Sequence, residues 1–344
     1  MVTVVAPLRG QSQKAPHLSV RVACAAATAQ SFTEEPFTEE SFTREPFTGE
    51  PFPEESFTRE SLIGESFVAY QYATYPFRLS GNLRIDPTDP HRVYAYVMNA
   101  GPGILSGDDL QWQVDVGDRA SLYLTDQSAT KVHSQPIDSA NAHMTYHFSV
   151  GSGAYLEYVP EPMILFSAAN LTQRMNITLH PQGTLVLSEI IVPGRLARGE
   201  YYKFEQFLSR MTVRSSSMRS SLMRSSLGRA VPTPEGSLLF ADALKLSGRS
   251  NQFRSHGFLT DYPILGSFII ISPELDREQL SEAIEAIDGV GGTLQLGTSP
   301  LPNCNGLFVR AMATQTNVIK DFQYQVLSLT RQMLNQPPLP AIPK

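Results

Sequence analysis

The chain of 344 residues is 42% hydrophobic, 9% aromatic and 17% charged, which is enough apolar material for one large core or two modest ones. Its longest apolar runs, such as residues 268–271, fall far short of the roughly 20 residues of a membrane-spanning helix. The net charge of −6 is concentrated in residues 31–67, which hold ten glutamates and two arginines, so the remainder is nearly neutral with 25 basic and 23 acidic residues.

The amino-terminal region reads as an extension. Residues 31–67 repeat a five-residue unit of the type SFTEE about seven times, and a period of five matches neither helix nor strand. Residues 20–27 loosely imitate the end of a secretory signal, but Arg21 interrupts the only apolar stretch. We therefore expect residues 1–67 to be a disordered extension and the protein not to be exported.

The two cysteines, Cys24 and Cys304, lie 280 positions apart. They cannot form a paired-cysteine metal motif or a disulfide framework, so a reducing compartment is the simpler interpretation. The sequence predicts a cytoplasmic protein.

From residue 68 onward, turn signals recur every 8 to 12 residues and the segments between them alternate between apolar and polar side chains. Three such segments are residues 110–116, 144–150 and 171–180. Turns such as Gly117-Asp118 and Pro181-Gln182-Gly183 separate consecutive strands by only a few residues, which favours antiparallel meanders. The pattern predicts a mainly β body over residues 68–335. We expect layered antiparallel β-sheets in this body, arranged as a sandwich or a stack, with part of the sheet wound helically.

Two amphipathic helices and one insertion interrupt this body. Residues 276–288 carry an apolar stripe that ends before Gly289, and residues 317–334 carry another that stops before a proline pair. The segment at about 214–236 is rich in serine and arginine but has no interleaved aromatic residue, so it lacks the stacking platform of a nucleic-acid site. Residues 336–344 are expected to be a carboxy-terminal tail.

The histidines do not predict a metal cage. His143 and His147 are four residues apart, but on an alternating strand their side chains would lie about 13 Å apart. His91, His133 and His180 lie near turns, where a structural or solvent-exposed role is expected. The sequence contains no nucleophile elbow, no Walker loop and no dinucleotide-binding glycine motif.

Polar groups gather instead at the ends of the expected strands. Four stretches contain them: NAGPGILSGDD (residues 99–109), LTDQSATKV (124–132), LEYVPEPMILF (156–166) and GRLARGE (194–200). In order and spacing these stretches resemble the urease accessory protein D family (UreD, also called UreH). The sequence departs from the family pattern at Pro102, where a glycine is usual, and in the repeat and serine-arginine segments.

The resemblance implies a non-catalytic chaperone for nickel insertion into urease. Such a protein binds apo-urease and accessory protein F, which carries accessory protein G, and can form a homodimer within the assembly; neither nucleic acid nor membrane is expected as a partner. No cofactor is bound tightly, and Ni²⁺ passes transiently along an internal path. A conduit needs scattered polar groups that replace part of the hydration shell without trapping the ion.

On that hypothesis, eight residues are candidates for the nickel path and two support the surrounding loops. The path candidates are Asp108, Asp109, Ser128, Thr130, Glu157, Glu161, Glu189 and Glu200, and the supporting residues are Lys131 and Arg195.

Two alternatives belong to other functional classes. A β-sandwich hydrolase would use Asp108 or Glu200 as acid or base and would turn over a substrate alone. A binding module for carbohydrate or protein would present an exposed aromatic platform, against which the inward-facing position expected for Trp112 argues.

Overall fold

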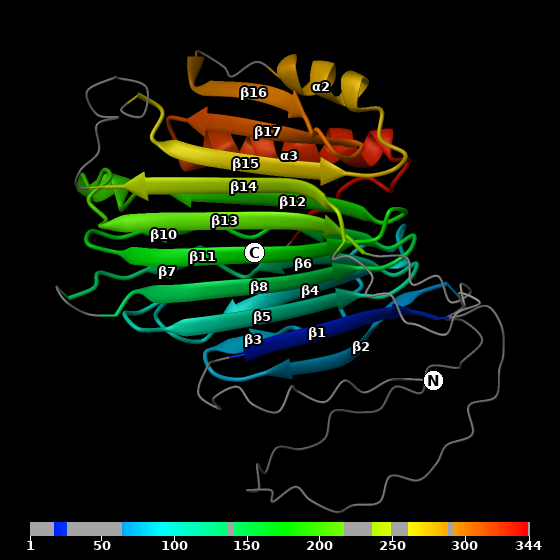
Figure 1. The fold of residues 1–344 in the computed structure, drawn as a ribbon, viewed down its shortest axis with the longest axis horizontal. Coiled ribbons are helices and arrows are strands. Elements are labelled where there is room, and N and C mark those ends of the chain that lie inside the picture. The colour runs from blue at the N-terminus through cyan, green and yellow to red at the C-terminus, as the bar shows by residue number, and fades with distance from the viewer. Residues whose placement is uncertain are drawn as a thin grey trace, which may run out of the picture.

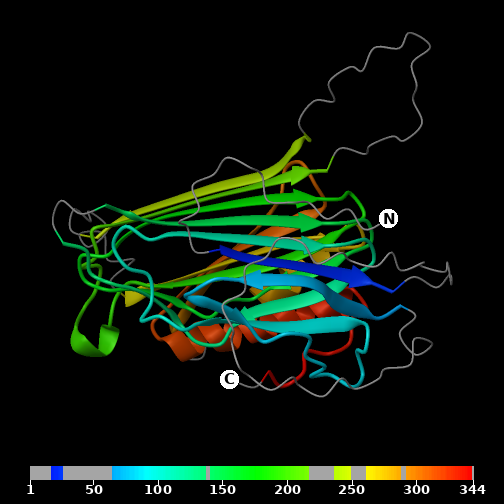
Figure 2. The same ribbon diagram turned by 90° about the horizontal axis from the view of Figure 1, so that it is seen from below.

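Two β-sheets and two helices form three layers in the computed structural model, which describes residues 17–25, 64–136, 140–216, 236–248, 261–287 and 292–342. The described strands form a seven-stranded and a ten-stranded sheet that face each other, and the helices cover the outer face of the ten-stranded sheet (Figures 1 and 2). A mainly β fold with two helices is therefore confirmed.

In spatial order, the seven-stranded sheet consists of β14 (Leu238–Ser247), β13 (Gln206–Ser215), β11 (Asn170–Leu179), β8 (Ala142–Val150), β5 (Asp109–Val116), β1 (His17–Cys24) and β2 (Ser66–Ala73). The ten-stranded sheet consists of β16 (Leu294–Pro300), β17 (Gly306–Ala313), β15 (Ile264–Ile271), β12 (Thr184–Val192), β9 (Tyr155–Tyr158), β6 (Ser121–Asp126), β4 (Arg92–Asn99) and β3 (Phe77–Leu79), with the short β10 (Met163–Leu165) and β7 (Thr130–Val132) alongside.

The expected antiparallel meander is wrong for the centre of both sheets. β5, β8, β11 and β13 pair in parallel, and so do β4, β6, β9 and β12. The short turns lie where the sequence placed them, but each carries the chain across to the facing sheet instead of back along the same one. Antiparallel pairing is confined to the sheet margins, such as β13–β14 and β15–β17. A reversal of direction and period-two alternation are common to both arrangements, so the sequence pattern did not distinguish them.

The folded body starts earlier than residue 68. β1 lies between β2 and β5, and Leu18, Val20 and Val22 on its inner face are fully buried. Residues 17–25 therefore belong to the sheet and not to the extension to which the sequence analysis assigned them. Most of the pentapeptide tract and of the serine-arginine segment lies outside the described residues.

The helices agree closely with the predicted segments. Helix α2 spans Arg277–Glu285 and helix α3 spans Thr316–Met333, while a short 3₁₀ turn, η2, covers Leu196–Arg198. The Asp276 side chain accepts a hydrogen bond from the Gln279 backbone N–H and so caps α2, whereas Gly289 lies outside the described residues. No helix in the described part of the chain is long and apolar enough to cross a membrane.

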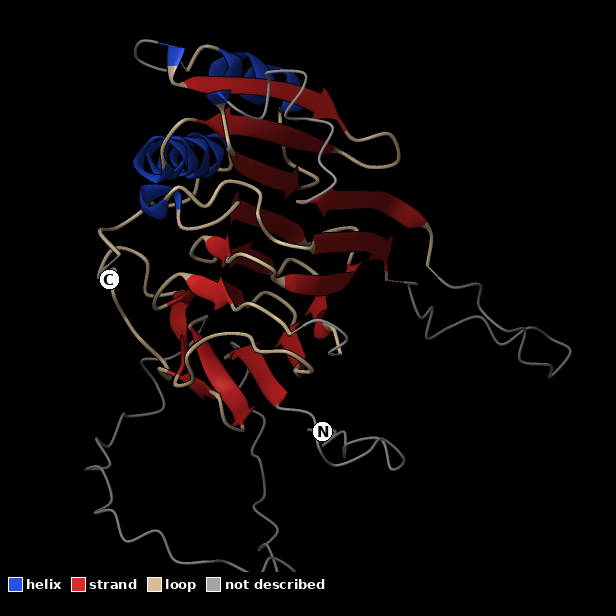
Figure 3. Cartoon of the chain, turned by 90° about the vertical axis from the view of Figure 1, so that its left-hand side faces the viewer, coloured by secondary structure: helices blue, strands red, loops and turns tan. Residues whose placement is uncertain are grey.

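Two hydrophobic cores follow from this layering. One lies between the sheets and includes Trp112, which is 2% exposed and lies 5.3 Å from the Tyr146 ring, centroid to centroid. The other lies between the ten-stranded sheet and the helices, where Phe322 of α3 packs edge-on against Phe268 of β15. Figure 3 shows the helices on one side of the strands. The ten-stranded sheet is thus buried on both faces.

Candidate functional site

Two adjoining cavities lie in the polar part of the space between the sheets. Asp126, Thr130 and Tyr146 line both, so the cavities meet at these three side chains. The first cavity extends past Trp112, Met144, Leu110, Ile104, Phe77, Val97, Asn99 and Ser128. The second extends past Tyr158, Pro160, Glu161, Met163, Gln173, Met175, Ser188, Glu189 and Ile190. The linings of both include carboxylates, hydroxyls and aromatic rings, and we call the two cavities together the interior passage.

The interior passage is narrow and its lining mixes polar and apolar side chains. Each cavity has a volume of about 20 Å³, which is room for about one water molecule. The buried indole Nε1–H of Trp112, which lines the first cavity, finds no acceptor among the described residues. A cavity of this size beside an unpaired donor has room for a water molecule but not for an organic ligand.

Glu189 in the second cavity is held by a neutral amide. Its Oε1 accepts a hydrogen bond from Nε2 of Gln173, whose Nε2 also contacts the Ser209 hydroxyl at 3.2 Å. Burial raises the pKa of Glu189, while the Gln173 hydrogen bond and the charge of Arg310 act against that rise. A neutral amide offsets little of the cost of burying a charge, so this carboxylate is poised to accept a proton or a cation.

Glu161 lies at the same cavity but is paired. Its Oε2 is 2.9 Å from Nζ of Lys320 on α3, and both side chains are partly exposed. Two of the three carboxylates of the second cavity thus lie in different settings, Glu161 beside a lysine and Glu189 held by an amide.

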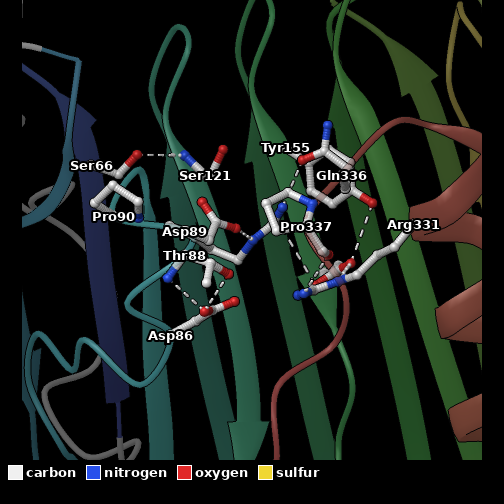
Figure 4. Close-up of polar contacts among 12 residues, drawn as sticks. Ser66, Asp86, Thr88, Asp89, Pro90, Ser121, Tyr155, Arg331, Gln336 and Pro337 are labelled. Atoms are coloured by element: carbon white, nitrogen blue, oxygen red, sulfur yellow. Dashed lines mark hydrogen bonds and ion pairs between the residues drawn. The ribbon is translucent and has the colours of Figure 1, made fainter.

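Glu157, by contrast, points away from the passage. It belongs to β9 but faces the helices, where Arg331 of α3 binds both of its oxygens and Nη1 of Arg92 lies 3.5 Å away. Arg92 also donates to Asp89 at 2.7 Å and to Gln336 at 2.7 Å, which ties the carboxy-terminal residues to the sheet (Figure 4). Burial alone would raise the pKa of Glu157, but the two arginines lower it. This cluster, the buried ion network, is a structural clamp.

Three further path candidates lie outside both cavities. The Asp108 carboxylate accepts a hydrogen bond from the Leu105 backbone N–H at 2.8 Å, and Asp109 is exposed at the start of β5. Glu200 is bound by Arg195, which lowers the pKa of Glu200 by hydrogen bonding. These side chains serve turns and loops in the structure.

The two supporting residues act in different ways. The Arg195 guanidinium also lies over the Phe166 ring, 4.5 Å from its centroid. Lys131 contributes through its backbone, since its carbonyl accepts a hydrogen bond from the Ile104 N–H, and its side chain is exposed.

His143 and His147 lie on the exposed face of β8, as the alternation of the strand predicted. Among the described residues, no group of three or more His, Cys, Asp or Glu side chains is arranged to hold a metal ion.

Exposed aromatic side chains gather at the edge strand β2. Tyr70, Tyr72 and Tyr75 have about half or more of their surface exposed, and Phe67 is 38% exposed. Tyrosine is enriched in protein interfaces, so this edge suits a protein that works by contact. Trp112 takes no part in it, because it is buried as expected.

Comparison with known proteins identifies the family. The family model for the UreD urease accessory protein matches residues 56–344. The chain belongs to the UreD family. It is 39% identical over 272 residues to the urease accessory protein UreD of Trichodesmium erythraeum (strain IMS101), covering 79% of this chain and 91% of that protein.

Archaeal relatives give the same result. The urease accessory protein UreD of Haloarcula marismortui is 32% identical over 78% of this chain and 82% of its own length, and that of Natronomonas pharaonis is 30% identical over 77% and 82%. Membership of the UreD family supports a role in urease maturation.

Two glycines of the UreD-like motifs lie where another part of the backbone packs closely against them. At Gly103, with φ of +139°, a Cβ would lie 2.3 Å from the Lys131 carbonyl oxygen. At Gly194, with φ of +135°, it would lie 2.0 Å from the Glu200 carbonyl oxygen. Only glycine fits either place. The motifs thus fix the loops at the ends of the strands, from which Ser128 and Thr130 reach the passage.

Sequence reasoning missed several polar residues of the passage, among them Asp126 and Gln173. Asp126 stands within the stretch LTDQSATKV, next to chosen candidates, and its place at the end of an apolar strand was the available signal. Gln173 carried a weaker signal, a polar residue on the apolar face of β11, where it is 2% exposed.

Proposed function

We propose that this UreD-family chain serves urease maturation as a non-catalytic assembly factor, and that Ni²⁺ travels along its interior passage toward apo-urease. In this role it connects apo-urease with accessory proteins F and G, and the ion is its cargo. The observation that carries the proposal is the meeting of two polar cavities at Asp126, Thr130 and Tyr146 inside a UreD-type body.

The donor set supports this cargo. Ni²⁺ accepts carboxylate, hydroxyl and water oxygens. Asp126, Glu161 and Glu189 supply carboxylates, and Ser128 and Thr130 supply hydroxyls. Because each cavity holds about one water, the ion must exchange most of its hydration shell for these groups as it moves. Scattered oxygens of this kind lower the cost of entry without holding the ion, as in channels.

The path proposed here is smaller than the set expected from the sequence. It keeps Ser128, Thr130, Glu161 and Glu189, adds Asp126, and leaves out the four candidates that line neither cavity, namely Asp108, Asp109, Glu157 and Glu200. The hydrolase alternative gains nothing from the latter group, since Arg195 keeps Glu200 ionised and makes it a poor proton donor.

Activation of urease in a co-expression system tests the proposal. Urease subunits and the remaining accessory proteins are expressed with this chain, without it, or with an Asp126→Asn or Glu189→Gln variant, and the nickel content and activity of the purified urease are measured. We expect both readouts to fall without the chain, and to fall with either variant while the assembled complex is still recovered by affinity purification.

The matched control is Glu282→Gln, which removes a carboxylate from the exposed face of α2. It should leave nickel content and activity unchanged. Equal activity with and without the chain would end the proposal as a whole, whereas full activity with both passage variants would end only the conduit.

A further inference from the structure

A row of residues in register continues from Glu189 across the ten-stranded sheet to its edge strand β16. In the ten-stranded sheet, Glu189 of β12 pairs in register with Ser267 of β15, and Ser267 pairs with Arg310 of β17. The next residue in this row is Gly297 of β16, where an added Cβ would meet nothing within 4 Å. The row therefore leads from a buried carboxylate to open space.

The seven-stranded sheet, which faces this row, has its edge beside Arg310. Its edge strand is β14, which pairs only with β13 in the described part of the sheet, while the ten-stranded sheet continues through β17 to β16. Asp242 of β14 reaches across the gap, and its Oδ2 accepts a hydrogen bond from Nη2 of Arg310 at 2.6 Å. This ion pair joins the two sheets where the sandwich would otherwise open, and we call it the lateral clasp.

The clasp is supported by aromatic packing. The Arg310 guanidinium lies over the ring of Phe308, 4.8 Å from its centroid, and Phe308 packs at 5.3 Å against Phe240 of β14. Both charged side chains remain about one-third exposed, so the clasp stands at the boundary between the interior and solvent.

We propose that the Arg310–Asp242 clasp closes a lateral mouth of the interior passage and keeps a divalent cation at Glu189 from escaping between β14 and β17. A cation leaving on this side must part the ion pair and pass a guanidinium of its own sign. Arg310 is thus a positioning residue that confines the cargo without binding it. The electrostatic influence of Arg310 on Glu189 agrees with this placement.

The inference rests on the proposed function, and a chelator distinguishes the two. The full accessory complex is loaded with NiCl₂, freed of excess metal, and mixed with apo-urease with or without EDTA, and urease activity is measured. Without EDTA, Arg310→Gln should activate urease as well as the wild-type chain does. With EDTA, we expect the urease activity obtained with Arg310→Gln to be about tenfold lower than that obtained with the wild-type chain. A tenfold change is the lower end of the effect that fixed charges have on local ion concentration.

Two variants separate confinement from general loosening. Arg310→Lys keeps the positive charge and should preserve activation in EDTA. Arg21→Gln removes a matched arginine–aspartate pair, with Asp115, on the outer face of the seven-stranded sheet, and should behave as wild type. Thermal unfolding of each variant checks that the body is intact.

Two results overturn the inference while leaving the proposed function in place. The first is that urease activation with Arg310→Gln resists EDTA as well as activation with the wild-type chain does. The second is that Arg310→Gln activates urease faster than the wild-type chain without EDTA, which would mean that the ion leaves for urease through this mouth. Activation that does not depend on this chain at all would overturn both.

Discussion

Two glutamates on neighbouring strands of one sheet show how different the two faces of that sheet are. Glu157 on β9 is fully buried and faces the helices, whereas Glu189 on β12 is partly buried and faces the opposite sheet. Two arginines surround Glu157 and lower its pKa, whereas Glu189 has an amide and a raised pKa. One carboxylate is compensated by two guanidinium groups, and the other is held by a neutral amide.

The difference separates structural from functional charge. A buried carboxylate bound by two guanidinium groups cannot exchange partners without unfolding the clamp. A buried carboxylate held by one amide can exchange the amide for an ion at little cost, because the amide was never a full counter-charge. The predictions below test whether the two glutamates differ in this way.

The largest effect is expected from Glu157→Gln. It removes the negative charge that faces Arg92 and Arg331, and leaves two buried like charges side by side. Breaking a buried pair in this way costs about 3–5 kcal/mol of unfolding free energy. Urea denaturation followed by circular dichroism measures it.

The matched control is Glu65→Gln, which breaks a partly exposed pair with Arg84 and should cost no more than about 1 kcal/mol. Similar losses in both variants would mean that the buried ion network is not a special clamp.

The stability difference between wild type and Glu157→Gln should depend on pH. The pKa of Glu157 is lower in the folded protein than the ordinary value of 4.5, so its ionised form stabilises the fold above pH 4.5, and this contribution is lost as the pH falls through the folded value. The difference in unfolding free energy between wild type and Glu157→Gln should therefore shrink below pH 4.5. Urea titrations at neutral pH and at steps below 4.5 check this, and a constant difference would contradict it.

A smaller effect is expected from Gln173→Leu. This change removes the amide that donates to Glu189 and to the Ser209 hydroxyl. Leaving a buried acceptor unpaired costs about 1–3 kcal/mol. Ser209→Ala, which spares the Glu189 contact, should cost less, and the reverse order in a denaturation experiment would show that Ser209 and not Glu189 is the important partner.

Strand positions were predictable from the sequence, but the faces that carry the site were not. Alternation placed Trp112 and the strand histidines correctly, because β5 and β8 have one exposed face. In β9 every residue is buried, so Leu156, Glu157 and Tyr158 carry no signal of which face is which. The set of path candidates therefore grouped Glu157 with Glu189 although the sheet separates them.

Long-range pairing explains the other misses. β1 carries a regular alternation, but its partners β2 and β5 lie beyond the repeat tract, so nothing local marked it as part of the body. Asp126 and Gln173 belong to one passage only because the turns carry the chain from sheet to sheet. Such contacts depend on topology, which a period-two pattern does not determine.

The smallest change, and the one of opposite sign, is expected from Glu189→Gln. Because burial raises the pKa of Glu189, its ionised form costs stability above pH 4.5, and the native state binds the proton more tightly than the unfolded chain does. Glutamine keeps an acceptor for Gln173 without the charge, so the variant should be at least as stable as wild type at neutral pH. The advantage should vanish as the pH falls toward 4.5, where the wild-type carboxylate takes up its proton. Urea denaturation measures both, and a large loss of stability would place Glu189 with Glu157 as a structural charge and remove the distinction between the two faces.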